Sequence, residues 1–274
     1  MNRNILYWFL RHLLSYPFYL SSLNYFKKNS KLYNHLKNQN IYIFGSGNSI
    51  NDHNLTILKN KNIVFLNNFI EFQEFAFIAK NNNCYYLIPP FHSPQTEQEI
   101  VKYLTKLEIK IPITVRIFLG VTPRRINAKK IVDKYSLFKN HLINYFFVSH
   151  YLPNKYNFEK AISHSDAGSI SAIYLSLFFG CKNIFLVGMD HDYLNYLHTK
   201  GNKFNFYKKN SIQDVQYKSV GDNDYIINEL YRQYKIFLDY KKIRDSTNAS
   251  IYNCSQRGIL NLFDRISIKD SLKI

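Results

Sequence analysis

The sequence predicts an α/β protein built on one doubly wound, mostly parallel sheet, and three observations support this fold class. Short apolar runs with the length of buried strands end in small or polar residues. A helix-length apolar run at residues 169–179 leads directly into a strand-like run at residues 183–187, which is the helix–strand unit of a parallel sheet. A chain of 274 residues with 46% hydrophobic and 20% charged residues can also bury one sizeable core.

The expected strands are short apolar runs bounded by turn residues. They lie at residues 41–44, 63–66, 84–88, 113–118, 183–187 and 250–253. The third run stops at Pro89 and Pro90, which have no amide hydrogen for a sheet ladder. Longer segments with helical spacing predict helices at residues 97–107, 169–179 and 224–240, and residues 51–61 form a helix or a turn. Gly180 directly follows the second helix, as is common at helix ends.

The expected organisation is a short amino-terminal segment followed by one larger domain. Residues 1–40 form the first part and are rich in aromatic side chains. Residues 41–274 form the second part, which carries the sheet, with a helical insertion expected around residues 90–160. Residues 120–163 have the weakest periodicity, and whether the insertion covers a site as a lid stays open.

The amino-terminal segment predicts an amphipathic helix. Residues 5–26 are largely apolar, but Arg11, His12 and Pro17 interrupt them. The longest stretch without charge or His, residues 13–26, is shorter than the roughly 20 residues of a membrane-spanning helix. No small-residue cleavage site follows, which argues against a cleavable signal. Aromatic residues flanked by Lys and Arg suit a helix at the membrane interface, and packing on the domain or on a second copy is the alternative.

The formal net charge of +17 comes from 36 Lys and Arg residues against 19 Asp and Glu residues. Such an excess suits nucleic acid, an anionic membrane surface or phosphorylated small molecules, or is simply a solvated basic surface. The sequence contains no zinc-finger spacing and no RNA-recognition signature, so we expect no nucleic-acid partner. Three separated cysteines, Cys84, Cys181 and Cys254, cannot close a disulfide framework and fit a reducing cytosol.

A glycine-rich turn follows the first expected strand and comprises Gly45, Ser46, Gly47, Asn48 and Ser49. Its two glycines allow a tight turn and a close backbone approach to a ligand, and amides at a following helix start attract phosphate. The turn is not a dinucleotide fingerprint, because Ile50 replaces the third glycine. It is not a Walker A loop either, because no Gly-Lys-Ser/Thr follows. A plain β-turn is the alternative interpretation.

Two further polar clusters stand where open parallel sheets bind ligands. Asn67 and Asn68 directly follow the second strand, and their amides suit a base edge or a ribose hydroxyl, or simply a turn. The segment SDAGS precedes the long apolar helix, and its first Ser or its Asp suits a helix N-cap. Gly168 and Ser169 in this segment would place a small residue and a hydroxyl against a ligand.

The most specific local cluster is GMDHD, which follows the strand expected at residues 183–187. It contains Asp190, His191 and Asp192, and His198 lies a few residues further on. A carboxylate beside a histidine can fix the imidazole tautomer for general-base catalysis, and two aspartates can instead bind a divalent ion. A polar loop without chemistry is the alternative.

Four segments together resemble one superfamily of enzymes. They are IYIFGSGNSI, IVFLNNF, SDAGSISAIYLSLFFGCKNIFLVGMDHDY and IYNCSQRGILNLFDRI, in the order expected for it. The superfamily contains the family-42 bacterial sialyltransferases, the motility accessory factor (MptE-like) flagellin glycosyltransferases and the archaeal hydroxymethylpterin diphosphokinases. The resemblance covers roughly residues 41–70 and 163–266, and the helix–strand–GMD block is its most specific part.

The resemblance implies a Rossmann-like sheet and metal-independent transfer of sialic acid from its CMP donor. It implies that the loop at residues 45–49 lies along the donor phosphate and ribose. It also implies nucleotide or donor contacts for Asn67 or Asn68, Gly168, Ser169, Asn253 and Ser255.

Two features differ from the family-42 pattern. Ser46 stands where that family typically has Asn, and residues 207–225 contain no His to match that family's general base. Tyr207 and Tyr217 remain in that stretch, and the resemblance implies that they stabilise the leaving phosphate.

The leading hypothesis is a glycosyltransferase of bacterial surface glycan synthesis, making lipooligosaccharide, capsule or O-antigen, with a CMP-activated sialic acid or related nonulosonate as donor. Its general base is His191, oriented by Asp190 or Asp192, or else His198. No metal and no cofactor are expected, since the CMP-sugar is a substrate. The alternatives are a Mg-dependent diphosphokinase-like phosphotransferase, with the two aspartates as ligands, and a non-catalytic member of a glycan pathway.

The expected partners are a nucleotide-sugar donor and a glycan acceptor, and the expected location is cytoplasmic. Peripheral contact with the inner membrane, through the basic surface and the amino-terminal aromatic residues, stays open. Homo-oligomerisation also stays open.

Overall fold

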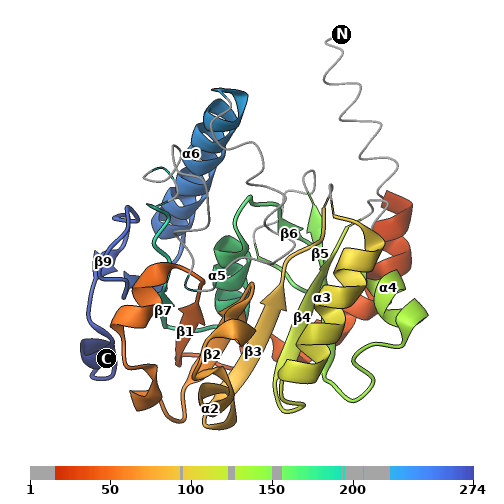
Figure 1. The fold of residues 1–274 in the computed structure, drawn as a ribbon, viewed down its shortest axis with the longest axis horizontal. Coiled ribbons are helices and arrows are strands. Elements are labelled where there is room, and N and C mark those ends of the chain that lie inside the picture. Colours follow the sequence, from red (N-terminus) through yellow and green to blue (C-terminus); the bar gives the residue numbers. More distant parts are fainter. Residues whose placement is uncertain are drawn as a thin grey trace.

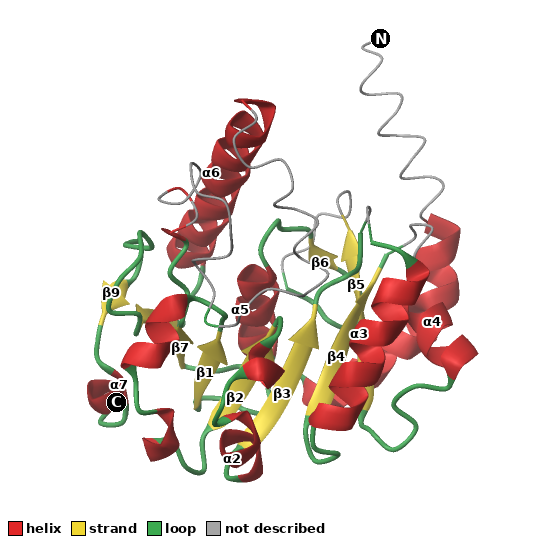
Figure 2. Ribbon diagram, in the orientation of Figure 1, coloured by secondary structure: helices red, strands yellow, loops and turns green. Residues whose placement is uncertain are grey.

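The structure of the protein, a computed structural model, describes residues 16–92, 95–122, 127–149, 156–192, 194, 206 and 223–274. Within these residues, nine strands form one sheet with helices on both of its faces, which confirms the α/β fold class (Figures 1 and 2). Every described pair of neighbouring strands runs parallel. The strands are β1 (Asn40–Phe44), β2 (Asn62–Leu66), β3 (Asn83–Ile88), β4 (Arg116–Val121), β5 (Ile143–Ser149), β6 (Ile162–Ser163), β7 (Asn183–Val187), β8 (Ser250–Asn253) and β9 (Asp264–Arg265).

The order of the strands makes the sheet doubly wound. Across the sheet this order is β6-β5-β4-β3-β2-β1-β7-β8-β9. The chain therefore begins in the middle at β1, builds the sheet outward to β6, and returns to the other side of β1 with β7. The last residues of β1 and β7, Phe44 and Val187, pair with each other, so the carboxyl ends of these two strands lie side by side. Open parallel sheets bind their ligands beyond such a switch point.

Helices and 3-10 turns cover both faces of the sheet. The helices that follow the amino-terminal one are α2 (Phe75–Lys80), α3 (Glu97–Lys110), α4 (Ala128–Tyr135), α5 (Gly168–Phe178), α6 (Asn223–Ser246) and α7 (Ile268–Ser271). Buried residues of α2, α3, α4 and α7 belong to one hydrophobic cluster, and those of α5 and α6 belong to a second. The successive side chains of β1 alternate between the two clusters, because neighbouring residues of a strand point to opposite faces.

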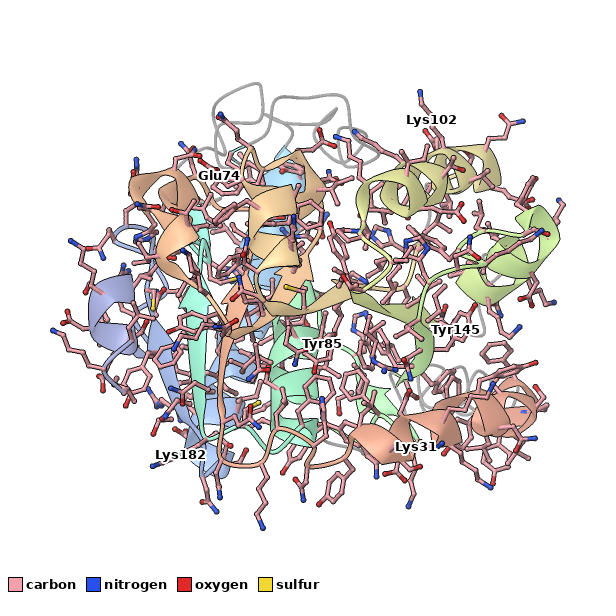
Figure 3. All side chains as sticks on the ribbon, turned by 90° about the horizontal axis from the view of Figure 1, so that it is seen from below. Lys31, Glu74, Tyr85, Lys102, Tyr145 and Lys182 are labelled. Carbon is pink, nitrogen blue, oxygen red and sulfur yellow. The ribbon has the colours of Figure 1, made fainter. Side chains whose placement is uncertain are left out.

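The strands are apolar on both faces because both faces are covered. Strands of this kind read as continuous hydrophobic runs rather than as alternating patterns. Figure 3 shows the result from below: Tyr85 of β3 lies in the interior, whereas Lys31, Lys102 and Lys182 lie at the periphery. The same rule explains why short apolar runs in the sequence identify the central strands.

Most of the expected elements are present, and the differences are local. Five of the six expected strands begin within one residue of the prediction, whereas β4 begins three residues later than expected. Residues 51–61, expected as a helix or a turn, contain the end of one 3-10 turn (Asn48–Asp52) and a second (Leu55–Ile57), so the turn is the observed alternative. Inside the expected insertion around residues 90–160, α3 and α4 alternate with β4 and β5, and both strands pair within the sheet. The sequence did not predict α2, α4, α7, β5, β6 or β9.

The described part of the amino-terminal segment begins with a helix over residues 16–27 that packs on the domain, followed by a 3-10 helix at Lys28–Leu32. Phe26 is fully buried, and its ring centroid lies 5.9 Å from that of Phe147 in β5. The outward side of the helix exposes Tyr16 and Leu20. Among the described helices, none is long and apolar enough to cross a membrane.

Candidate functional site

The candidate site lies at the carboxyl edge of the sheet, around the switch point between β1 and β7. The GSGNS loop leaves β1 there and docks on the loop that follows β7. The amide of Gly45 donates to the carbonyl of Val187 at 2.8 Å, and the amide of Gly47 donates to the carbonyl of Gly188 at 2.8 Å. The GSGNS loop and the GMDHD cluster, which lie far apart in the sequence, therefore form one structural unit.

The two glycines of the loop are required by this docking. A Cβ atom on Gly45 would lie 2.6 Å from the carbonyl oxygen of Gly188, and one on Gly47 would lie 2.6 Å from the carboxyl carbon of Asp190. Distances this short do not occur for real Cβ atoms, so a side chain at either position would separate the loops. From the sequence, the glycines were expected to allow a close approach of the backbone to a ligand, whereas the described contact is with the neighbouring loop.

Asp190, in the loop after the neighbouring strand β7, holds the GSGNS loop in place. Its carboxylate accepts a 2.8 Å hydrogen bond from the amide of Ser49 and a second hydrogen bond from the Ser49 hydroxyl. The residue is only 2% exposed, so these hydrogen bonds are shielded from water. From the sequence, Asp190 or Asp192 was expected to orient His191; the described hydrogen bonds of Asp190 are with Ser49.

The loop after β8 supports this arrangement from below. The hydroxyl of Ser255 accepts from the amide of Met189 at 3.0 Å, and the side chain of Asn253 bonds the Ser255 amide at 2.9 Å and the Leu260 carbonyl at 2.8 Å. Gly258 has a φ of +90° and packs on the backbone of Asp190. Asn253 and Ser255, which the resemblance placed beside the nucleotide, are buried and brace the two loops.

Asn67 is held in an unusual backbone conformation at the end of β2. Its φ is +54°, a region that Asn enters more readily than most residues with a side chain. Its carbonyl oxygen accepts from the hydroxyl of Tyr86 at 2.5 Å and from that of Tyr103 at 3.0 Å. Non-glycine residues fixed in such conformations concentrate at functional sites. Neither tyrosine was identified from the sequence, because each sits in an apolar pattern that predicts core packing.

The side chain of Asn67 reaches both neighbouring elements. Its amide nitrogen lies 3.4 Å from the hydroxyl of Ser46 in the GSGNS loop, as a weak hydrogen bond. A Cβ atom on Gly168, the first residue of α5, would lie 3.8 Å from the Asn67 amide oxygen and 3.0 Å from Pro89. Asn67 therefore stands between the loop and the amino terminus of α5. Asn68 is buried beside it and begins the next 3-10 turn.

Within the described residues, no side chain caps the amino terminus of α5 at this edge, and the amide of Ile170 donates to the Ala167 carbonyl at 3.2 Å. The N-cap is Ala167, whose methyl side chain cannot accept a hydrogen bond from the first amides of the helix. The expected N-cap residues have other partners, since Ser165 accepts from the Ala167 amide at 3.4 Å and Asp166 pairs with Lys235 at 2.5 Å. An uncapped helix amino terminus carries a partial positive charge and binds anions.

Tyr240 joins two predicted site residues on the α6 side. Its hydroxyl lies 2.6 Å from the Ser169 hydroxyl and 2.7 Å from Nε2 of His191. His191 has a φ of +51° and is buried. Burial, with a further contribution from the positive charge of Arg232, lowers its pKa to about 4, so the imidazole is neutral at physiological pH.

The pKa of Asp192 shifts in the opposite direction. Burial, followed by the negative charge of Asp190, raises its pKa to about 6. The side chain is nevertheless ionised at neutral pH. A carboxylate with this pKa is a stronger base than an ordinary aspartate.

The structure thus brings most of the predicted residues together in three groups of contacting residues. One group contains the GSGNS loop, Asn67 and the start of α5, and a second group contains Asp190 with the loop after β8. The third group consists of Ser169 and His191, which both hydrogen-bond to the hydroxyl of Tyr240. His198, Tyr207 and Tyr217 lie outside the described residues. Among the residues that are described, no group of three or more His, Cys, Asp or Glu side chains could hold a metal ion.

No protein-family model and no curated protein match the chain. Among solved structures, it is similar to the sialyltransferase CstII from Campylobacter jejuni in complex with the substrate analogue cytidine-5′-monophosphate, at 16% identity and a TM-score of 0.45, covering 84% of this chain and 86% of that chain. It is also similar to CstII in complex with CMP-3FNeuAc, at 12% identity and a TM-score of 0.39, covering 84% and 85% of the two chains. These values leave the activity to be inferred from the site itself.

Proposed function

We propose that this protein is a glycosyltransferase of bacterial surface glycan synthesis that takes sialic acid or a related nonulosonate from a CMP-activated donor. One observation carries the proposal: the GSGNS loop, Asn67 and the uncapped start of α5 converge at the switch point of the sheet. Asn67 lies between the other two: its amide nitrogen is 3.4 Å from the Ser46 hydroxyl, and a Cβ atom on Gly168 would lie 3.8 Å from its amide oxygen. The sequence resemblance described above supplies the donor class.

In this proposal the donor phosphate binds at the amino terminus of α5. The first amides of α5 and the positive end of the helix dipole attract a phosphate group, which a helix start binds without a metal ion. The side-chain amide of Asn67 both donates and accepts, so it suits the cytosine edge or a ribose hydroxyl. Asn48 begins the short 3-10 turn after the glycines and would contribute a second amide.

Transfer needs a base that removes the proton of the acceptor hydroxyl while the sugar leaves the phosphate of CMP. His191 is hydrogen-bonded to Tyr240, and its pKa of about 4 makes it a weak base. Asp192 has a pKa of about 6, closer to the value that serves a base at neutral pH. We therefore add Asp192 to His191 and His198 as candidates for the base. Tyr207 and Tyr217 keep their proposed role at the leaving phosphate.

The first experiment is a binding measurement on the purified full chain. Thermal unfolding is recorded with CMP, UDP, GDP and ATP, each with and without Mg²⁺. A ligand at 100 times its Kd adds about 2.7 kcal/mol to the free energy of unfolding, so CMP alone should raise the unfolding temperature clearly. The intact CMP-sugar donor is then incubated with the protein and candidate acceptors, and the release of CMP is measured.

The same measurement decides against the proposal in two ways. Stabilisation by ATP only in the presence of Mg²⁺ would favour the phosphotransferase, for which Asp190 and Asp192 would have to bind the metal. The hydrogen bonds of Asp190 to Ser49 already occupy one of these carboxylates. No response to any nucleotide would favour a non-catalytic protein of a glycan pathway.

Peripheral contact with the inner membrane belongs to the same proposal. The helix over residues 16–27 exposes Tyr16 and Leu20, and the chain carries a net charge of +17. Exposed aromatic residues and positive charge together favour anionic membranes. Sedimentation with vesicles of anionic lipid should retain the full chain and lose a form that starts at residue 29; equal binding by both forms would remove this helix from the proposal.

A further inference from the structure

The helix α6 is apolar on two opposite sides. Its inner side is built from Ile236, Tyr240 and Ile243, which are buried in the same hydrophobic cluster as α5. Its amino-terminal half extends beyond the carboxyl ends of the strands, as Figure 1 shows. A helix on the surface of a globular protein normally has one apolar stripe and a polar opposite face. A second apolar side indicates a further partner.

The outer side carries a narrow apolar stripe at regular spacing. Ile227, Tyr231 and Tyr234 are 63%, 62% and 61% exposed, and Leu238, which is half-buried, continues the row. A helix turns about 100° per residue, so this row lies on the side opposite to Ile236. The intervals between the four residues are four, three and four. This is the spacing of a coiled-coil seam, in which each apolar residue inserts into a second helix.

From this stripe we infer that the outer side of α6 is the interface with a second copy of the chain, with the two α6 helices packed antiparallel. The four stripe residues are symmetric about the midpoint between Arg232 and Gln233. A two-fold axis through that point places Ile227 opposite Leu238 of the second copy and Tyr231 opposite Tyr234 of the second copy. Such an isologous contact closes after two copies.

The charges at the two ends of the stripe match this antiparallel arrangement. The same two-fold axis places Asp224 opposite Lys241 of the second copy, so each end of the helix pair joins an acid with a base. Both side chains are exposed, and Lys241 forms an ion pair with Asp245 on its own helix at 2.7 Å. A parallel arrangement would place like charges opposite each other, so the charges select the antiparallel one.

A second copy fits this face better than a lipid surface does. Acids and bases alternate in the carboxyl-terminal half of α6, where Lys241 pairs with Asp245 and Lys242 lies 3.7 Å from Asp239. A helix that binds anionic membranes has a basic polar face without this balance. The stripe is also only one or two side chains wide, which suits a helix partner.

The test is the mass of the full chain in solution, measured by sedimentation velocity over a range of concentrations. We expect a monomer–dimer equilibrium, and the double substitution Tyr231→Lys, Tyr234→Lys should shift it to monomer. Because both tyrosines are highly exposed, the unfolding temperature of this variant should match that of the parent chain at concentrations at which the parent is a monomer. Ile109→Lys is the matched control, since Ile109 of α3 is 78% exposed and lies outside the stripe; this variant should dimerise normally.

A charge exchange tests the antiparallel register. Asp224→Lys and Lys241→Asp should each weaken the dimer several-fold, because each variant places like charges at both ends of the pair. The chain that carries both substitutions should recover the parent affinity. A monomer at every concentration, a dimer that survives the double lysine substitution, or no recovery in the exchanged chain would overturn the inference. If the parent chain is a monomer that binds vesicles, loss of this binding in the variant Tyr231→Lys, Tyr234→Lys would assign the face to lipid instead.

Discussion

At the scale of single residues, the candidate site depends on side chains whose partners are far away in the sequence. Asp190 and Ser49 are 141 residues apart, and their hydrogen bonds join the loops of β1 and β7. Asn67 is fixed by hydroxyls from β3 and α3. Each of these residues therefore has a structural and a proposed functional role, and substitutions can separate the two.

Asn67 allows this separation through its positive φ. Asn67→Gly keeps the backbone conformation and removes the amide, whereas Asn67→Ala removes the amide and places a Cβ in the left-handed region. We expect both variants to lose CMP binding, and only the Ala variant to lose about 1 kcal/mol of unfolding free energy relative to the Gly variant. Calorimetric titration with CMP and urea unfolding measure the two effects. Unchanged CMP binding in both variants would remove Asn67 from the donor site.

Replacement of Asp190 should strongly reduce the free energy of unfolding. Asp190→Ala leaves the amide and hydroxyl of Ser49 without their buried acceptor, and we expect a loss of about 2–3 kcal/mol in unfolding free energy. Ser49→Ala removes only the hydroxyl and should cost about 1 kcal/mol. The double variant should cost less than the sum of the two, because the residues act on the same hydrogen bond. Strict additivity in urea unfolding would show that the two side chains are not coupled.

At the scale of the elements, the amino-terminal segment depends on one buried asparagine. The short 3-10 helix at Lys28–Leu32 carries Asn29, whose amide nitrogen donates to the carbonyls of Tyr145 at 2.9 Å and Phe158 at 2.8 Å. Its amide oxygen accepts from Asn144 of β5 at 2.8 Å. These bonds fix the segment to the edge of the sheet, together with the contact of Phe26 on Phe147.

Replacement of Asn29 should therefore loosen a whole element. Asn29→Ala leaves two carbonyls and the Asn144 amide with lost partners inside the protein, and we expect a loss of about 2–4 kcal/mol of unfolding free energy. Amide hydrogen exchange should increase in the helix over residues 16–27 more than in β1 and β7. Asn54→Ala, which removes an exposed cap from a 3-10 turn, is the matched control and should cost about 1 kcal/mol or less. Equal effects of the two substitutions would contradict the anchoring role.

The elements also show which parts of the fold were predictable. β1, β2, β3, β7 and β8 were predicted because both faces of the sheet are covered, so each of these strands is a compact apolar run. β6 and β9 consist of two residues each, which is too short for any period to appear. α4 is a short helix of eight residues, rich in charged side chains, and its helical spacing does not stand out from that of a polar loop.

The site was predictable only as far as it follows strand ends. The GSGNS loop, Asn67 and the GMDHD cluster were identified because each directly follows an apolar run. Their mutual contacts depend on the order of the strands, which places β7 beside β1 and not beside β6. The contact between Asp190 and Ser49 could not be read from the sequence for this reason. Tyr240 was missed because it sits in a helical pattern that resembles any other buried face.

At the scale of the whole molecule, two neighbouring titratable groups affect stability in opposite directions. The pKa of His191 falls from an ordinary 6.5 to about 4 in the folded chain. The unfolded chain therefore binds a proton that the folded chain does not, and His191 reduces stability as the pH falls from 6.5 to 4. The pKa of Asp192 rises from an ordinary 3.8 to about 6. Asp192 therefore reduces stability as the pH rises from 3.8 to 6.

These two contributions largely cancel in the parent chain between pH 4 and 6, and single substitutions should expose them. His191→Asn tolerates the positive φ and does not titrate, so it removes the loss of stability in acid. Relative to the parent, its unfolding free energy should increase by about 2–3 kcal/mol between pH 6.5 and pH 4. Asp192→Asn should instead gain about 1–2 kcal/mol relative to the parent as the pH rises from 4 to 7.

Urea unfolding at half-unit steps of pH measures both differences directly. Groups that titrate elsewhere in the chain contribute equally to parent and variant, so the difference curves isolate His191 and Asp192. Opposite slopes of the two difference curves between pH 4 and 6 are the expected result. Flat difference curves would mean that both groups titrate alike in the folded and unfolded chains, and that the loop after β7 is open to water. In that case Asp192 would be an ordinary carboxylate, and its candidacy as the base would lose its physical basis.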